Sequence, residues 1–289
     1  MSGEFRPTKE FFIGIDSDGC VFDTMEVKHK ECFIPNIIKH FGLASVSKYA
    51  RECAEFVNLY SKWRGINRFP ALLRSFELLA ERPEVVKRGV TIPKLERLQA
   101  WTDEETKLGN PALAAKVEQS GCEELAQCLA WSEEVNATVN DVVFNVPPFP
   151  MVRESLERLS SVADMFVVSA TPNDALNREW EENGVRKYVA RICGQESGSK
   201  KETLAIASQY PAGQSLMLGD APGDLNAARA NGTLFYPVNP GAEDASWQRF
   251  FVEAISRFLD GTYAGAYQES LIAEFETYLP ETPPWKEKG

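Results

Sequence analysis

The chain has 289 residues, of which 44% are hydrophobic and 25% are charged, and its formal net charge is −11. This length and composition are typical of a globular protein with about two domains, and they exclude a largely disordered chain. The acidic balance argues against a nucleic-acid partner, because binding to the phosphate backbone requires a basic surface.

Targeting and redox signals indicate a cytoplasmic location. The N-terminal sequence MSGEFRPTKE is polar and lacks the apolar segment of a signal peptide. No apolar stretch approaches the roughly 18 residues of a membrane span, so we expect no membrane partner. The six cysteines form no CxxC pair, and reduced thiols in the cytoplasm are the simplest interpretation.

The stretch 11–23, FFIGIDSDGCVFD, joins an apolar run to acidic residues. Short apolar runs predict buried strands, and carboxylates are rarely buried in such a core without a partner. We therefore expect a strand that ends at Asp16 and opens onto a crevice, with Asp18 beside it. Gly19 lets the backbone turn directly afterwards. In open α/β sheets, ligands bind at this edge.

After Asp23 the apolar spacing becomes helical and stays so as far as the proline-rich stretch 147–150. We interpret this segment as an all-helical insert. The predicted helices are Glu26–Phe41 with a break at Pro35, Ser45–Tyr60 capped by Ser45, Phe69–Ala80, a helix after Thr91 through Trp101, Asn110–Val117, and a long helix after Gly121.

From Met151 helices and strands alternate, which predicts a parallel sheet with right-handed crossovers. The predicted strands are Met165–Val168, Val189–Cys193, Ser215–Leu218 and Thr233–Val238. The predicted helices are Met151–Ser161, one capped by Asn173, one from Ser199 to Ser208 with a capping box, one from Asp224 to Gly232, Ser246–Leu259 and Tyr263–Tyr278. The fold class is therefore α/β, with helices on both faces of a parallel sheet, plus an all-α domain. We assign 1–24 and 148–240 to the α/β core, 25–147 to the helical insert, and 241–289 to a helical extension packed on the core.

Polar residues follow three of the predicted strands, namely Asp16 and Asp18, Ser169, and Asp220 and Asp224. Two carboxylates 4 Å apart repel by roughly 4 kcal/mol at an effective dielectric constant near 20. A cluster of them is stable only with protons or a cation, and oxygen ligands alone favour Mg²⁺. Together with Lys200 and a hydroxyl group, such a metal site suits a phosphoryl group. A carboxylate could attack phosphorus, and a second acid could transfer the proton.

Four motifs in this order resemble the haloacid dehalogenase (HAD) superfamily. They are DSDGCVFD (16–23), VVSAT (167–171), GSKKETL (198–204) and GDAPGD (219–224). The resemblance spans most of the chain, and the combination is far more specific than any single motif. It implies a Rossmann-like core and Mg²⁺ as cofactor. It also implies a helical cap between the first two motifs, as in relatives of β-phosphoglucomutase and phosphoglycolate phosphatase. Cys20 departs from the threonine that the family often has after the glycine.

The resemblance also implies roles for individual residues. Asp16 would be the nucleophile and a Mg²⁺ ligand, and Asp18 would be the general acid and base, with its backbone carbonyl on the metal. Ser169 and the amide of Ala170 would bind the phosphoryl oxygens. Lys200 would neutralise charge between Asp16 and the phosphoryl group, with Lys201 as the alternative lysine. Asp220 would bind the metal, and Asp224 would bind it directly or through water.

Substrate recognition is expected from the cap. The segment WRGINR (63–68) resembles the G-x-x-R cap segment of β-phosphoglucomutase-like members. Arginine is suited to bidentate contact with a carboxylate or phosphate. Arg68 is therefore the candidate for substrate recognition, followed by Arg64. A solvated or structural arginine on a helical cap is the alternative.

The leading hypothesis is a Mg²⁺-dependent phosphatase that hydrolyses a small phosphorylated metabolite through an aspartyl phosphate. A phosphomutase would use the same core residues and hand the phosphoryl group to a sugar instead of water. A dehalogenase fits less well, because it needs neither Asp18 nor a metal, and a phosphonatase would have a small residue in place of Asp18. In a different class, the chain could be a non-catalytic binding or sensor protein that keeps the fold.

Overall fold

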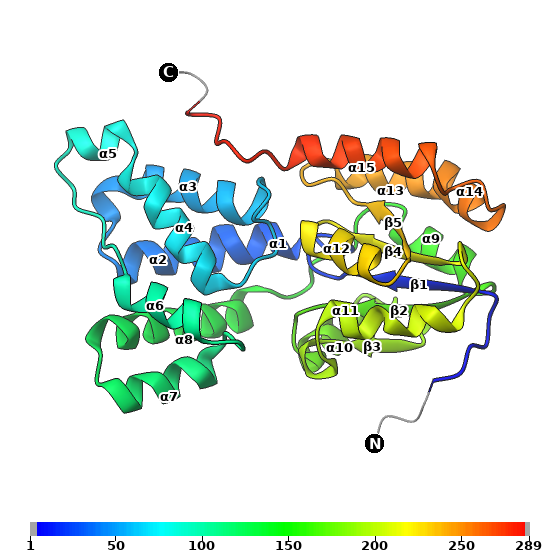
Figure 1. The fold of residues 1–289 in the computed structure, drawn as a ribbon, viewed down its shortest axis with the longest axis horizontal. Helices are drawn as coiled ribbons and strands as arrows, with labels where there is room; N and C mark the ends of the chain where they lie inside the picture. The colour runs from blue at the N-terminus through cyan, green and yellow to red at the C-terminus, as the bar shows by residue number, and fades with distance from the viewer. Residues whose placement is uncertain (1–4, 287–289) are drawn as a thin grey trace. The chain divides into compact units, whose positions relative to one another are not determined.

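The computed structural model describes residues 5–286. They form two compact units. The α/β unit contains the residues up to Met25 and Asn145–Pro280, and the helical unit contains Glu26–Phe144 and the residues from Glu281. The chain therefore passes between the units three times. Figure 1 shows that the strands belong to the first unit and that the second is built from helices. No helix within the described part of the chain is long and apolar enough to span a membrane.

The sheet of the α/β unit has five strands within residues 5–286, in the order β3-β2-β1-β4-β5, and each pair of neighbours is parallel. The chain moves outward from the central strand β1 on one side through β2 and β3, and on the other side through β4 and β5. The order therefore reverses between β1 and β4, where open α/β sheets bind ligands. The strands are β1 (Phe11–Ile15), β2 (Ala163–Val168), β3 (Arg191–Cys193), β4 (Ser215–Gly219) and β5 (Leu234–Pro237).

Strand β1 is buried on both faces, as parallel strands usually are. Phe11, Ile13 and Ile15 join one hydrophobic cluster, whereas Phe12 joins the other. At Gly14 an added Cβ would lie 2.7 Å from Leu204 Cδ2, so the helix on that face approaches the backbone closely. The strand therefore lies between two cores, and the chain leaves the sheet at its carboxyl end, at Asp16.

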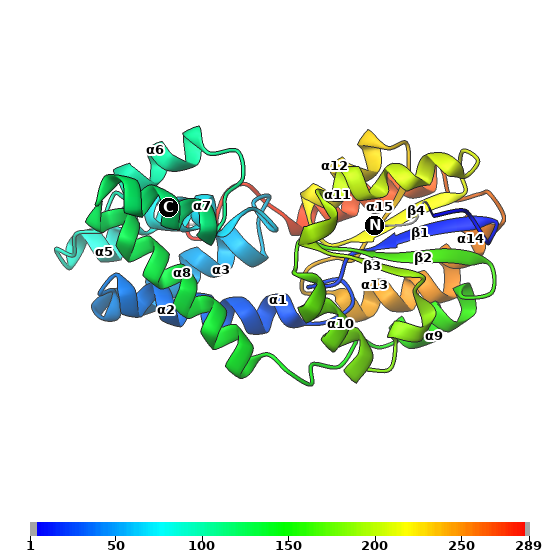
Figure 2. The ribbon, with the colours of Figure 1, turned by 90° about the horizontal axis from the view of Figure 1, so that it is seen from below.

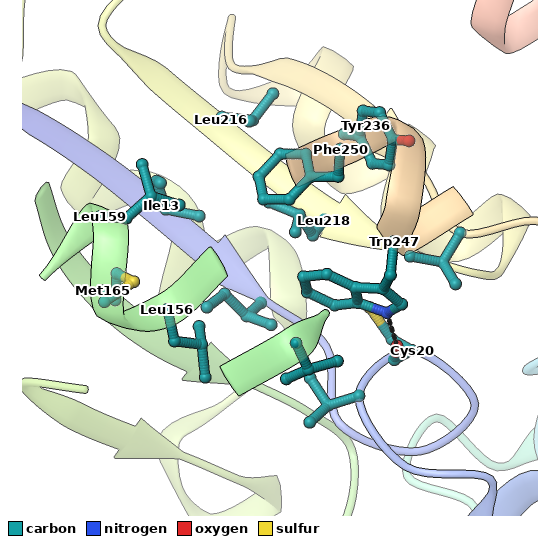
Figure 3. Packing of buried hydrophobic residues seen from close by; sticks show 14 of the residues in the cluster. Ile13, Cys20, Leu156, Leu159, Met165, Leu216, Leu218, Tyr236, Trp247 and Phe250 are labelled. Carbon is teal, nitrogen blue, oxygen red and sulfur yellow. Dashed lines mark hydrogen bonds between the residues drawn. The ribbon is translucent and has the colours of Figure 1, made fainter. Parts of the chain in front are cut away.

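Helices cover both faces of the sheet, as Figure 2 shows with α11, α12 and α15 on one side and α9, α10 and α13 on the other. Figure 3 shows part of the core on the α9 and α13 side, where Trp247 packs near Phe250 and donates a hydrogen bond of 2.7 Å to the Cys20 carbonyl. The helices are α9 (Val152–Leu159), α10 (Asn173–Glu182), α11 (Lys200–Leu204), α12 (Pro222–Ala230), α13 (Glu243–Arg249), α14 (Ile255–Leu259) and α15 (Ala266–Tyr278).

The helical unit has its own hydrophobic core, which includes Phe69, Trp101 and Trp131. Trp101 and Trp131 both meet the ring of Phe69 edge-on, with centroids 5.1 and 6.2 Å away. The helices are α1 (Thr24–Val27, which begins in the α/β unit), α2 (Ile34–His40), α3 (Ser47–Leu59), α4 (Arg68–Ala80), α5 (Pro83–Lys87), α6 (Glu96–Glu104), α7 (Asn110–Ser120) and α8 (Glu123–Val142).

The predicted fold class is confirmed, and the departures are local. The break expected at Pro35 is a π-helical turn, Lys28–Phe33, after which Pro35 lies in the first turn of α2. Ser45 does not cap α3, because a 3₁₀ turn occupies Ala44–Val46. The helix expected after Thr91 begins only at Glu96. Helix α5 was not predicted.

The described end of the chain differs from the predicted extension on the core. Helix α15 does pack on the sheet, where Phe275 meets Phe235 with ring centroids 5.8 Å apart. Residues from Glu281, however, belong to the helical unit. Trp285 explains the difference, because its ring lies 5.6 Å from that of Phe56 and 4.4 Å from the Arg82 guanidinium.

Candidate active site

The loop after β1 presents Asp16 at the carboxyl end of the sheet. The Asp16 amide donates to the Leu218 carbonyl of β4 at 3.0 Å, which continues the sheet for one residue. The residue is only 5% exposed, and its carboxylate Oδ1 accepts a hydrogen bond of 2.8 Å from the Ser17 amide. Gly19, with a φ of +75°, then turns the chain, as expected for a residue without a Cβ.

Asp18 is held by two hydroxyl groups. Thr171 Oγ1 donates to Asp18 Oδ2 at 2.7 Å, and Thr24 Oγ1 donates to Oδ1 at 2.5 Å. Thr171 ends the VVSAT motif and Thr24 follows the first motif directly, so these contacts join two motifs that are far apart in the sequence. Sequence reasoning missed both threonines, since a threonine in a turn carries no signal of its distant partner.

Lys200 lies at the start of α11 and bridges two carboxylates. Its Nζ is 2.6 Å from Asp16 Oδ2 and 2.6 Å from Asp224 Oδ1. The predicted capping box of Ser199 and Glu202 is present and fixes the start of this helix. The Lys201 side chain is exposed, so the structure brings Lys200 and not Lys201 to the acids.

Asp220 and Asp224 come from the end of β4 and the first turn of α12. Asp224 Oδ2 accepts hydrogen bonds from the amides of Asp220 at 3.2 Å and Ala221 at 3.1 Å. A Cβ added at Gly219 would lie 2.4 to 2.6 Å from the Asp224 side chain, so the glycine makes room for it. Asp220 and Asp224 are 1% and 0% exposed.

One oxygen from each of Asp16, Asp220 and Asp224 lies within 4.8 Å of the others. Burial, reinforced by Asp224 and Asp220 and only partly opposed by Lys200, raises the pKa of Asp16 well above its ordinary value. Burial alone would lower the pKa of Lys200, but Asp16 and Asp224 outweigh it and raise that pKa. Three carboxylates against one ammonium group carry excess negative charge. This all-oxygen donor set therefore fits a hard divalent cation such as Mg²⁺.

Ser169 and Ala170 follow β2, the neighbour of β1. The Ser169 amide donates to the Cys193 carbonyl at 3.0 Å, and its hydroxyl accepts a hydrogen bond of 3.3 Å from the Thr171 amide. Ser169 is 5% exposed, whereas Ala170 is exposed. In the register of β1 and β2, Ile15 pairs with Val167. Ser17 and Ser169 each come two residues after this pair, so they lie at the same level beyond the two strands.

The two candidate arginines belong to the helical unit and make contacts inside it. Arg68 Nη1 donates to the Ser132 carbonyl, the Ser132 hydroxyl and Asn136 Oδ1 at 2.8 to 3.0 Å. Its guanidinium lies 4.9 Å from the centroid of the Phe33 ring, and burial lowers its pKa to about 10. Arg64 is 3% exposed and donates to the Leu59 carbonyl at 2.8 Å. The Arg68 contacts join α4 to α8, whereas the Arg64 bond reaches the end of α3. A role in substrate recognition stays a prediction for both arginines.

Comparison with known families supplies the assignment. Residues 91–238, just over half of the chain, match the model of the haloacid dehalogenase-like hydrolase family. The chain belongs to this family. The family predicted from the four motifs is thus confirmed. The matched range contains the motifs of Ser169, Lys200 and Asp220, whereas Asp16 and Asp18 precede it. A search of curated proteins found no match.

Solved structures resemble the chain at low sequence identity. A predicted phosphoglycolate phosphatase from Haemophilus somnus is 13% identical, with a TM-score of 0.45 over 80% of this chain and 86% of that one. A haloacid dehalogenase-like hydrolase from Streptococcus pneumoniae is 14% identical, with a TM-score of 0.42 over 82% and 90%. One from Xanthomonas campestris is 13% identical, with a TM-score of 0.41 over 87% and 97%. The family assignment depends on the family model, since these TM-scores are all below 0.5.

Proposed function

We propose that the protein is a Mg²⁺-dependent phosphatase that hydrolyses a small phosphorylated metabolite through an aspartyl phosphate on Asp16. One observation carries this proposal, namely the Lys200 ammonium 2.6 Å from both Asp16 and Asp224 within a cluster of three buried carboxylates. Membership of a hydrolase family supports it. A binding protein would have no need for a buried nucleophile next to a positioned acid.

In the first step Asp16 attacks phosphorus, a bond forms between its carboxylate oxygen and phosphorus, and the bond to the leaving oxygen breaks. Asp18 gives its proton to the leaving oxygen. In the second step water attacks the phosphorus, Asp18 takes the proton from the water, and Asp16 is released. Thr24 and Thr171 orient Asp18 for both transfers.

The remaining groups stabilise charge on the phosphoryl oxygens. The Ser169 hydroxyl and the Ala170 amide donate hydrogen bonds to them, and Lys200 neutralises charge between them and Asp16. Asp16, Asp220, Asp224 and the carbonyl of Asp18 would hold Mg²⁺. When bound, the cation supplies positive charge to the transferring group and lets the carboxylates ionise together.

A screen of about a hundred phosphorylated metabolites with and without Mg²⁺, with Asp16→Asn as the control, tests this proposal. We expect release of phosphate that depends on Mg²⁺ and disappears in the variant. Isomerisation of a sugar monophosphate without release of phosphate would instead identify a phosphomutase. Turnover without metal would contradict the mechanism. If the protein hydrolyses nothing and its cellular role survives Asp16→Asn, it is a binding protein.

A further inference from the structure

Ser17 lies between the two acids of the first motif, and its side chain contacts α10 instead of the acids. The residue is fully buried. Its hydroxyl donates to Glu179 Oε2 at 3.0 Å and accepts a hydrogen bond of 3.0 Å from Trp180 Nε1. Trp180 is also fully buried. One hydroxyl group therefore links two consecutive residues of α10 to the loop that carries Asp16 and Asp18.

The backbone of Ser17 shapes that loop. Its amide donates to Asp16 Oδ1 at 2.8 Å. Its carbonyl accepts hydrogen bonds from Val21 at 2.9 Å and Phe22 at 3.2 Å, which closes the turn that carries Asp18. The amide thus orients the Asp16 carboxylate, the carbonyl fixes the turn, and the hydroxyl ties both to a helix.

A second set of contacts joins the same two segments. Thr171, two residues before α10, donates to Asp18 at 2.7 Å. The Trp180 ring meets Phe22 of the loop edge-on, with centroids 5.8 Å apart. The loop after β1 and the segment from Ser169 into α10 are therefore joined at both ends of the helix.

We propose that Ser17, Trp180 and Glu179 form a positioning relay, which fixes the orientation of Asp16 and Asp18 relative to the segment that begins at Ser169. This inference rests on the proposed function. In-line attack and proton transfer both require reacting groups within a fraction of an ångström of the productive geometry. A loop that could pivot on β1 would separate the two acids from Ser169 and Ala170, which donate hydrogen bonds to the phosphoryl oxygens. The relay prevents that movement. None of the three residues touches substrate in this scheme.

A double-mutant cycle tests the relay. Ser17→Ala removes the hydroxyl, Trp180→Phe removes the indole N–H and keeps a ring against Phe22, and the double variant removes both. Hydrolysis of p-nitrophenyl phosphate with saturating Mg²⁺ gives kcat and KM for each protein. We expect each single variant to lower kcat by about 10-fold with KM changed by less than about twofold, and the double variant to lose no more than the larger single loss.

Ser155→Ala is the matched control, because Ser155 is also fully buried and its hydroxyl has no hydrogen-bond partner within residues 5–286. We expect its kcat to be unchanged. Thermal unfolding followed by circular dichroism checks that all variants are folded at the assay temperature. Single-variant losses that multiply in the double variant, or a Ser17→Ala enzyme with the kcat of the wild type, would overturn the relay while leaving the proposed function intact.

A calorimetric titration with Mg²⁺ adds a measurement that needs no turnover. Because Asp16 belongs to the carboxylate cluster, we expect Ser17→Ala to raise the Kd for Mg²⁺ about fivefold and Ser155→Ala to leave it unchanged. If the wild type binds Mg²⁺ but hydrolyses no phosphoester, the proposed function is wrong. In that case, equal Kd values for Mg²⁺ in the wild type and in Ser17→Ala would overturn the relay as well. A wild type that does neither contradicts both proposals.

Discussion

Lys200 begins α11 and Asp224 lies in the first turn of α12, and yet Lys200 Nζ lies 2.6 Å from Asp224 Oδ1. The contact ties α11 to α12 across the carboxyl edge of the sheet. Because Lys200 also bonds Asp16, the ammonium group balances part of the charge of the carboxylate cluster. Removing it should therefore affect chemistry as well as stability.

Replacing Lys200 with methionine should lower kcat by about 10²–10³-fold, the loss typical of removing one group that stabilises charge in the transition state. The change also leaves Asp16 and Asp224 without their cation, so the melting temperature should fall. Lys201→Met is the matched control, because that side chain is exposed. Steady-state hydrolysis of p-nitrophenyl phosphate checks both, and equal losses in the two variants would show that Lys200 has no special role.

Gly219 should tolerate no side chain. An alanine Cβ would lie 2.4 to 2.6 Å from atoms of Asp224, which must then move. Since a displacement of about 1 Å in such a site can cost 10²-fold, we expect Gly219→Ala to lower kcat by at least that factor. Gly223→Ala is the control, because nothing lies within 4 Å of its added Cβ and alanine favours a helix. An active Gly219→Ala enzyme would mean that the Asp224 position is unimportant.

Asp164, at the amino end of β2, should contribute to stability in a pH-dependent way. It accepts hydrogen bonds from the Thr8 amide and hydroxyl, the Lys9 amide and the Tyr210 hydroxyl, at 2.6 to 3.0 Å. Burial alone would raise the pKa of Asp164, but these donors outweigh burial and lower it. We expect Asp164→Asn to reduce the free energy of unfolding by about 2–3 kcal/mol at pH 7, and Tyr210→Phe by about 1–2 kcal/mol.

The sign of the pH effect follows from the lowered pKa. The folded protein binds this proton less readily than the unfolded chain, so the stabilisation is complete above the unfolded pKa of about 4 and is lost as the pH falls through the folded value. Urea unfolding of wild type and Asp164→Asn between pH 8 and pH 3 measures this. The difference between the two proteins should be constant above about pH 5 and shrink below pH 4. A difference that grows in acid would contradict the assignment.

Trp285 should hold the end of the chain on the helical unit through Phe56 and Arg82. Replacing it with alanine removes an aromatic pair and a cation–π contact, together worth about 1–3 kcal/mol. We expect faster amide hydrogen exchange in α3 and around Arg82, measured by mass spectrometry. Lys286→Ala, which removes an exposed ion pair with Glu81, should leave exchange unchanged. Unaltered exchange in Trp285→Ala would show that the ring contributes nothing to this unit.

Local sequence determined much of the fold and the site. The run FFIGI before Asp16 predicted β1, and the serine and glutamate at 199 and 202 predicted the start of α11, because strand burial and helix capping depend on nearby residues. The acids at 16, 220 and 224 could be grouped because the carboxyl ends of parallel strands meet at one edge.

The parts that escaped prediction depend on partners that are distant in the sequence. Thr171 meets Asp18 across 153 residues, and Ser17 meets Trp180 across 163. The π-helical turn over Lys28–Phe33 is a shift in helical register, which apolar spacing alone does not reveal. The contacts of Arg68 with Ser132 likewise required the tertiary structure, since nothing around residue 68 indicates a partner on α8.

The central place of β1 has a consequence for the order of synthesis. This strand leaves the ribosome well before its partners β2 and β4, which lie at 163–168 and 215–219. Nearly all of the helical unit is made in between, so it can fold while β1 still has no neighbour. A nascent chain therefore carries an exposed apolar strand until β2 has been made, and such an unpaired segment is a site of aggregation or chaperone binding. A pause in translation before β2 would lengthen that exposure, whereas one after β5 would not.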